Sequence, residues 1–70
     1  MFNSQHTLIT KREKEILRHV NAGMKSIEIA QELGLSKHTI DNHRKNILWK
    51  TGCANTLEMV QWGMKNNLLT

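Results

Sequence analysis

The fold of this chain is decided by one stretch of thirteen residues, Glu28-Ile29-Ala30-Gln31-Glu32-Leu33-Gly34-Leu35-Ser36-Lys37-His38-Thr39-Ile40. A helix-turn-helix needs a small residue where its two helices cross, then a turn residue that tolerates positive φ. Ala30 and Gly34 are suited to these two places. Leu35 follows as an apolar plug, Ser36 as an N-cap and Ile40 as an inward aliphatic residue. All five requirements are met in register, so the stretch predicts a helix-turn-helix.

Helix signals continue on both sides of this stretch. Apolar residues recur three and four positions apart, and the chain has no proline. Thr10 followed by Glu13 is a capping box that opens one more helix, and Asn55 with Glu58 opens another. The chain is therefore expected to be helical before and after the helix-turn-helix.

The expected helices cover approximately residues 11–22, 26–33, 37–50 and 56–66. Their spacing predicts these inward residues, helix by helix: Ile16, Leu17 and Val20; Ile29, Ala30 and Leu33; Ile40, Ile47 and Leu48; Leu57, Val60 and Met64. The fold class is all-α, a compact four-helix domain containing a helix-turn-helix. This domain is expected to span residues 8–70, after a flexible tail of residues 1–7.

The charge distribution points to a polyanionic partner. The formal net charge is +4, which alone leaves a merely basic small protein equally open. Four of the ten Lys and Arg residues, however, lie between Ser36 and Lys50, against a single acid, Asp41. Because that segment is expected to be helical, its polar face has the properties of a recognition helix in the major groove.

Catalytic and metal-dependent functions find little support. The single cysteine, Cys53, excludes an internal disulfide, and the four histidines lack zinc-ligand spacing. No nucleophile elbow, phosphate loop or zinc-protease motif is present. No signal peptide or membrane-spanning stretch is visible. We therefore expect a cytoplasmic protein that is no enzyme, needs neither metal nor cofactor, and does not act at a membrane.

The chain resembles the LuxR-type, or GerE-type, helix-turn-helix domain of bacterial transcription regulators over about residues 8–69. The resemblance rests on Ile9-Thr10-Lys11-Arg12-Glu13, Ile16-Leu17, Gly23, Glu28-Ile29-Ala30, Leu33, Ser36, Thr39-Ile40, His43, Asn46-Ile47-Leu48, Lys50 and Gly52. It implies four helices, with the second and third forming the helix-turn-helix. The chain departs from the family at Asp41, where a basic residue is common, at Thr51, usually leucine or methionine, and at Ile27, usually polar.

The resemblance also implies site residues. Those that match the family's base-contacting positions are Asp41, Asn42 and Lys45. Those at positions suited to phosphate contacts are Ser36, Lys37, Thr39, Arg44 and Lys50. An aspartate repels phosphate, but it can accept a hydrogen bond from the amino group of cytosine. The sequence therefore predicts specific binding to double-stranded DNA and leaves the target sequence open.

The fourth helix is expected to form a homodimer contact. Met59 and Trp62 lie three residues apart and would form one exposed apolar strip, the kind of surface at which proteins associate. The alternative is that Trp62 covers the first helix as part of the core. RNA polymerase is a further candidate partner. Two other functions stay open, a sigma-factor region-four module and a protein-interaction domain without DNA binding, for which Asp41 is the main hint.

Overall fold

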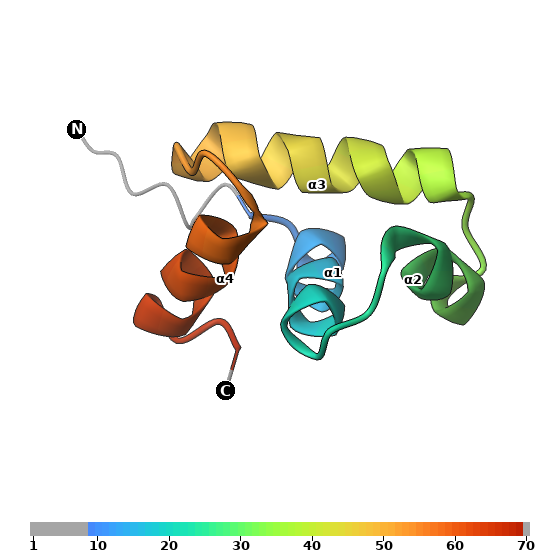
Figure 1. Ribbon diagram of the computed structural model, residues 1–70, viewed down its shortest axis with the longest axis horizontal. Helices are drawn as coiled ribbons and strands as arrows, with labels where there is room; N and C mark the ends of the chain where they lie inside the picture. Colours follow the sequence, from blue (N-terminus) through green and yellow to red (C-terminus); the bar gives the residue numbers. More distant parts are fainter. Residues whose placement is uncertain (1–8, 70) are drawn as a thin grey trace.

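The structure is a computed structural model that describes residues 9–69. Its helices are α1 (Lys11–Asn21), α2 (Ser26–Leu33), α3 (Lys37–Thr51) and α4 (Thr56–Lys65). The described residues contain no strand, so the predicted all-α class with four helices is confirmed. α1 lies between α4 and α2, and α3 runs across all three (Figure 1). The predicted tail, residues 1–7, lies outside the described residues.

Both capping patterns outside the helix-turn-helix are present. The backbone N–H of Glu13 donates to Thr10 Oγ1 at 3.0 Å, and the N–H of Thr10 donates to Glu13 Oε1 at 3.0 Å. At the start of α4, the N–H of Glu58 donates to Asn55 Oδ1 at 2.9 Å. These bonds satisfy N–H groups that have no partner inside a helix, which is why both helices begin where the sequence predicts.

The helix-turn-helix has the predicted turn. Gly34 adopts a left-handed conformation with φ +69°. A residue with a side chain would be strained in this conformation. The backbone N–H of Leu35 donates to the carbonyl of Ala30 at 2.9 Å. Ser36 caps α3, because its Oγ accepts a hydrogen bond from the N–H of Thr39 at 3.1 Å. The turn thus joins α2 and α3 within three residues, and it fixes the direction of α3.

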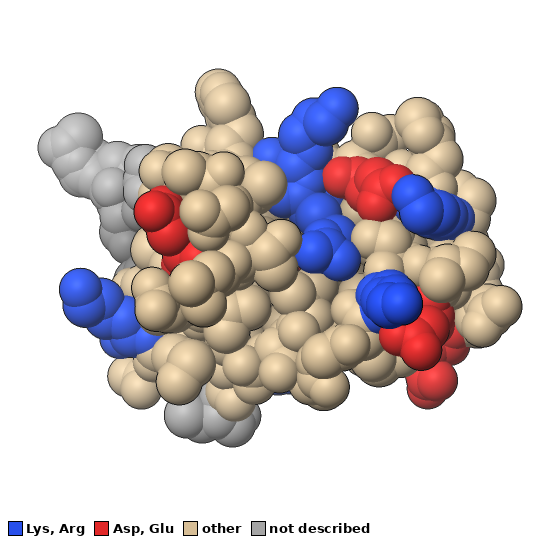
Figure 2. Space-filling model, in the orientation of Figure 1, with Lys and Arg blue, Asp and Glu red and all other residues tan. Residues whose placement is uncertain are grey.

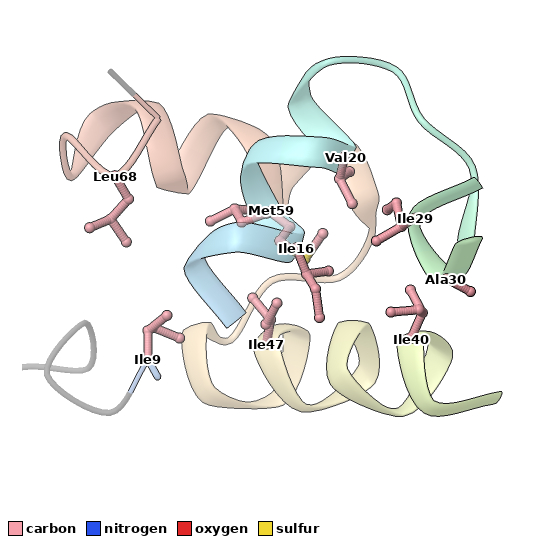
Figure 3. Packing of buried hydrophobic residues seen from close by; sticks show 10 residues of the cluster. Ile9, Ile16, Val20, Ile29, Ala30, Ile40, Ile47, Met59 and Leu68 are labelled. Atoms are coloured by element: carbon pink, nitrogen blue, oxygen red, sulfur yellow. The ribbon is translucent and has the colours of Figure 1, made fainter. Parts of the chain in front are cut away.

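The core lies between α3 and the other helices. Ile40 and Ile47 are fully buried and point from α3 toward α2 and α1 (Figure 3). The predicted inward residues of α1 and α2 are buried with them, except Leu33. Leu33 and Leu48 are half-buried and pack against the core. The buried hydrophobic residues are Ile9, Ile16, Leu17, Val20, Ile29, Ala30, Ile40, Ile47, Met59 and Leu68. This core fixes which face of α3 remains in solvent.

The predicted inward face of α4 is wrong at two of its three positions. Leu57 and Met64 are exposed, with 66% and 57% of their surfaces accessible. Met59 and Gly63 face inward instead, one turn apart. A Cβ at Gly63 would lie only 2.9 Å from Leu17 Cδ2. α4 therefore turns its glycine toward α1, because only a residue without a side chain allows this close approach.

The segment after α4 also packs onto the molecule. Asn67 adopts a positive φ of 59°, and the N–H of Leu68 donates to the carbonyl of Gly63 at 2.8 Å. Leu68 is consequently only 9% exposed. Leu68 and Leu69 thus pack on the core beside α4.

Candidate nucleic-acid interface

The face of α3 opposite the core carries a continuous row of side chains. Ile40 and Ile47 are buried, and a helix places residues three, four and seven positions apart on one face. The side chains opposite these isoleucines are all exposed, and we call them the outer stripe: His38, Asn42, Lys45 and Trp49. The outer stripe is therefore held in solvent by the burial of the other face.

Two of the predicted base-contacting residues, Asn42 and Lys45, lie on the outer stripe. Asn42 Nδ2 lies 3.4 Å from His38 Nε2. Within residues 9–69, the ammonium of Lys45 has no hydrogen-bond or ion-pair partner. The two side chains thus present an amide and a cation to solvent. These are groups that can pair with adenine, or with guanine or phosphate, respectively.

Asp41 lies at the flank of the outer stripe, and it is paired. Lys37 Nζ donates to Asp41 Oδ2 at 2.7 Å. Hydrogen bonds from Lys37 and from Ser26 hold the pKa of Asp41 below its ordinary value. The carboxylate is therefore charged at neutral pH, and the lysine offsets its repulsion of phosphate. The pairing thus partly neutralises the acidic residue that stands where the LuxR-type domains that the sequence resembles often have a basic one.

Ser36 and Thr39 form the N-terminal end of α3. Ser36 Oγ and Thr39 Oγ1 lie 2.9 Å apart, beside the first turn of the helix. The N-terminus of a helix carries a partial positive charge and N–H groups that suit anions. The position of Ser36 and Thr39 at this N-terminus is compatible with the phosphate contacts predicted for them.

Arg44 joins three helices. Its Nη1 donates to Ser26 Oγ at 3.1 Å and its Nη2 donates to Thr56 Oγ1 at 3.0 Å. The side chain is half-buried and ties the starts of α2 and α4 to α3. A guanidinium has more N–H donors than these two bonds use, so the predicted phosphate contact of Arg44 stays a prediction.

The phosphate contact predicted for Lys50 stays a prediction, and the structure shows a contact of this lysine with α1. Lys50 Nζ donates to both carboxylate oxygens of Glu13, at 2.8 and 3.1 Å. Glu13 is only 3% exposed, so its charge needs this partner. Lys50 is half-buried and links the start of α1 to the end of α3. The sequence offered no signal for it, because the two residues lie 37 positions apart.

The predicted apolar strip of α4 is not exposed. Met59 is fully buried, and Trp62 is half-buried and packs against the core. The alternative reading of Trp62, as part of the core, is the one that the structure supports. The exposed apolar residues of α4 are Leu57 and Met64, seven positions apart and therefore on one face. We call this pair the α4 apolar face.

Basic residues also lie on α1, away from the outer stripe. Lys11, Lys14 and Arg18 line an open hollow with Glu15. Helical spacing places them opposite the buried face of α1, which packs on the other helices. On the side that Figure 2 shows, basic side chains gather over α3 with an acidic group between them. The basic residues of α1 and the outer stripe of α3 are thus separate surfaces.

Among residues 9–69, no helix combines the length and apolarity needed to cross a bilayer. Over the same range, no three His, Cys, Asp or Glu side chains form a group that could hold a metal ion.

Comparison with known proteins identifies the family. Residues 7–63 match the family described as bacterial regulatory proteins, luxR family. The transcriptional regulatory protein UhpA of Salmonella typhimurium is 45% identical over 51 residues, which cover 73% of this chain and 26% of that protein. UhpA of Escherichia coli K12 is 42% identical over 53 residues, 76% of this chain and 27% of that protein.

A more distant relative gives the same picture. The oxygen regulatory protein NreC of Staphylococcus aureus is 36% identical over 62 residues, which cover 89% of this chain and 29% of that protein. The chain thus spans between a quarter and a third of the length of these relatives. No solved structure is significantly similar to it. The chain belongs to the luxR family of bacterial regulatory proteins, and it is a DNA-binding domain of the LuxR, or GerE, helix-turn-helix type.

Proposed function

We propose that this chain binds double-stranded DNA sequence-specifically as part of a bacterial transcription regulator, with α3 in the major groove. The observation that carries the proposal is the outer stripe of α3, which is held in solvent by a fully buried opposite face. A major groove admits an α-helix, and base edges are reached from the N-terminal turns of a recognition helix. The named regulators that match this chain agree with this role.

The base contacts are assigned to Asp41, Asn42 and Lys45. Asn42 is suited to adenine, and Lys45 to guanine or phosphate. Asp41 is suited to the amino group of cytosine once Lys37 has offset its charge. The phosphate contacts set the position of the helix on the duplex and do not read its sequence. They are assigned to Ser36, Lys37, Thr39, Arg44 and Lys50.

A homodimer is proposed as the form that binds a full site. A single small module buries only about 600–1,000 Å² on DNA, which limits its affinity. Two copies related by a twofold axis would occupy two half-sites about one helical turn apart. α4 is assigned to the dimer contact through its apolar face, Leu57 and Met64, in place of Met59 and Trp62. The regulator would act in the cytoplasm, and a contact with RNA polymerase stays a prediction.

Selection of bound duplexes from a random pool tests the proposal. We expect one sequence to be enriched. If about four phosphates are neutralised, the decimal logarithm of the binding constant should fall by about 3 to 4 for each tenfold rise in salt concentration. Binding without polymerase would set the domain apart from a sigma-factor module. If no sequence is enriched and the affinity for DNA does not change with salt, the fold serves protein contacts instead.

Lys45→Ala is the matching variant. It should weaken binding to the selected duplex by about 1–3 kcal/mol if Lys45 reads a base, and weaken all duplexes alike if it holds a phosphate. Lys11→Ala is the control, because Lys11 is an exposed lysine on the far side of α1. Equal losses from both variants would contradict the placement of α3 in the groove.

A further inference from the structure

Trp49 is an aromatic side chain that the proposed contacts leave unused. It is 83% exposed, whereas Trp62, the other tryptophan of the chain, is half-buried against the core. Tryptophan is highly buried on average, because its large ring gains much free energy when it leaves water. A tryptophan that is exposed on a rigid helix therefore suggests a surface that becomes covered on binding.

The position of Trp49 on α3 indicates what covers it. It lies seven residues after Asn42 and four after Lys45, so all three side chains share the outer stripe. Seven residues of helix place Trp49 about 10 Å beyond Asn42 along the axis. A major groove is about 12 Å wide, so a helix with Asn42 at the base edges carries Trp49 to the groove wall. That wall is the sugar–phosphate backbone.

The chemistry of Trp49 and its neighbours suits such a wall. The indole N–H is a donor without acceptor capacity, and phosphate oxygens accept hydrogen bonds. The apolar ring can pack against deoxyribose. Lys45 lies one turn away on the same stripe, while Asp41, the one acidic residue of α3, lies two turns away and is paired with Lys37. Charge around Trp49 therefore favours a polyanion.

We propose that Trp49 binds the DNA backbone at the wall of the major groove, with its ring against deoxyribose and its indole N–H donating to a phosphate. The inference rests on the proposed function, since it requires α3 to enter the groove. Such a contact would hold the C-terminal half of α3 on the duplex and set its register, without reading bases. It extends the interface by two turns beyond Asn42.

Fluorescence in the variant Trp62→Phe tests this contact, because Trp49 is then the one remaining tryptophan. The variant is titrated with the duplex selected from the random pool, and the accessibility of Trp49 to acrylamide is measured. On saturation, quenching by acrylamide should fall severalfold. Trp49 that stays as accessible in the saturated complex as in the free protein would overturn the inference. Fluorine NMR of the unsubstituted protein with 5-fluorotryptophan gives the same answer if Trp62→Phe unfolds.

Affinities of Trp49 variants supply the second arm. Trp49→Ala should weaken binding about tenfold on selected and random duplexes alike, because backbone contacts carry no sequence information. Trp49→Phe should bind DNA with an affinity between those of the unsubstituted protein and Trp49→Ala, because it keeps an aromatic ring but loses the N–H. Ile27→Ala is the control, since Ile27 is an exposed apolar residue on α2.

The outcomes separate this inference from the proposed function. If the unsubstituted protein binds and responds to Lys45→Ala, but Trp49→Ala binds as tightly, only the contact of Trp49 fails. If Trp49→Ala instead lowers self-association while DNA affinity is unchanged, the side chain serves a protein interface and the inference is overturned. If the unsubstituted protein binds no duplex, both proposals fall together.

Discussion

At the scale of single residues, the pair of Glu13 and Lys50 is expected to matter most for stability. The carboxylate is almost fully buried, and it accepts hydrogen bonds from Thr10 and Lys50. Glu13→Gln keeps the shape but removes the charge opposite Lys50. We expect it to lower the free energy of unfolding by about 1–3 kcal/mol, measured by urea denaturation.

The pair of Arg12 and Glu15 offers the matched control for that experiment. Arg12 Nη1 lies 3.4 Å from Glu15 Oε1, and both side chains are well exposed. Exposed pairs contribute about 0–1 kcal/mol, because water screens them. Glu15→Gln should therefore change stability far less than Glu13→Gln. Similar losses for the two variants would show that the buried position of Glu13 carries no special weight.

The pairing of Asp41 with Lys37 can be checked through proton binding. Because the pKa of Asp41 is lowered in the folded protein, its charged form favours folding above the unfolded pKa, and this contribution is lost as pH falls through the folded value. Lys37→Met should raise the pKa of Asp41. The pKa is measured by NMR of the carboxyl carbon during an acid titration. Ser26→Ala should raise it less. An unchanged pKa in Lys37→Met would disprove the pairing in solution.

Local residue roles could be predicted from the sequence, and distant ones could not. Thr10, Ser36 and Asn55 cap helices as expected, because a cap is fixed by residues three positions apart. The roles of Lys50 and Arg44 depend on partners in other helices. These partners are therefore a property of the tertiary structure, and sequence spacing alone does not reveal them.

At the scale of helices, the orientation of α4 depends on Gly63. Gly63→Leu should destabilise the fold by about 2–3 kcal/mol, because the new side chain overpacks against Leu17 and Leu69. The neighbouring change Met64→Leu introduces the same residue at an exposed position, and it should be nearly neutral. Thermal or urea unfolding of both variants compares them. A neutral Gly63→Leu would mean that α4 does not approach α1 as closely as the structure shows.

The error in α4 has a physical cause that the sequence contained. Leu57, Val60 and Met64 follow helical spacing, so they form an apolar face as convincing as the true one. A glycine inside a helix costs about 0.5–1 kcal/mol relative to alanine, so its presence at position 63 indicated a close helix contact. That cost favours the face of Gly63 and Met59 as the buried face of α4. In the other three helices, the predicted inward residues are buried or pack against the core.

At the scale of the whole molecule, three surfaces lie on different helices. The outer stripe belongs to α3, the α4 apolar face belongs to α4, and α1 carries the open hollow lined by Lys11, Lys14, Glu15 and Arg18. α3 crosses the other helices at one side of a molecule that measures 37 × 21 × 19 Å (Figure 1). In the proposed function, this division would leave α4 of one copy free to meet another copy while α3 holds DNA, as a dimer on two half-sites requires.

The α4 apolar face makes the dimer testable. Leu57→Ser and Met64→Ser should each lower the dimer fraction in sedimentation, because both remove apolar surface that is exposed in one copy. They should leave folding nearly unchanged, since neither residue belongs to the buried core. Ile27→Ser, which alters an exposed apolar residue on α2, should leave the dimer fraction as it was.

The same variants distinguish a dimer formed on DNA from one formed in solution. On a duplex with two half-sites, Met64→Ser should bind more weakly than the unsubstituted protein, because the second copy gains nothing from the first. On a duplex with one half-site the two proteins should bind alike, since α3 is untouched. If the affinities for two half-sites also agree, and the unsubstituted protein sediments as a monomer at every concentration, α4 forms no dimer contact. Each copy would then hold its half-site through α3 alone.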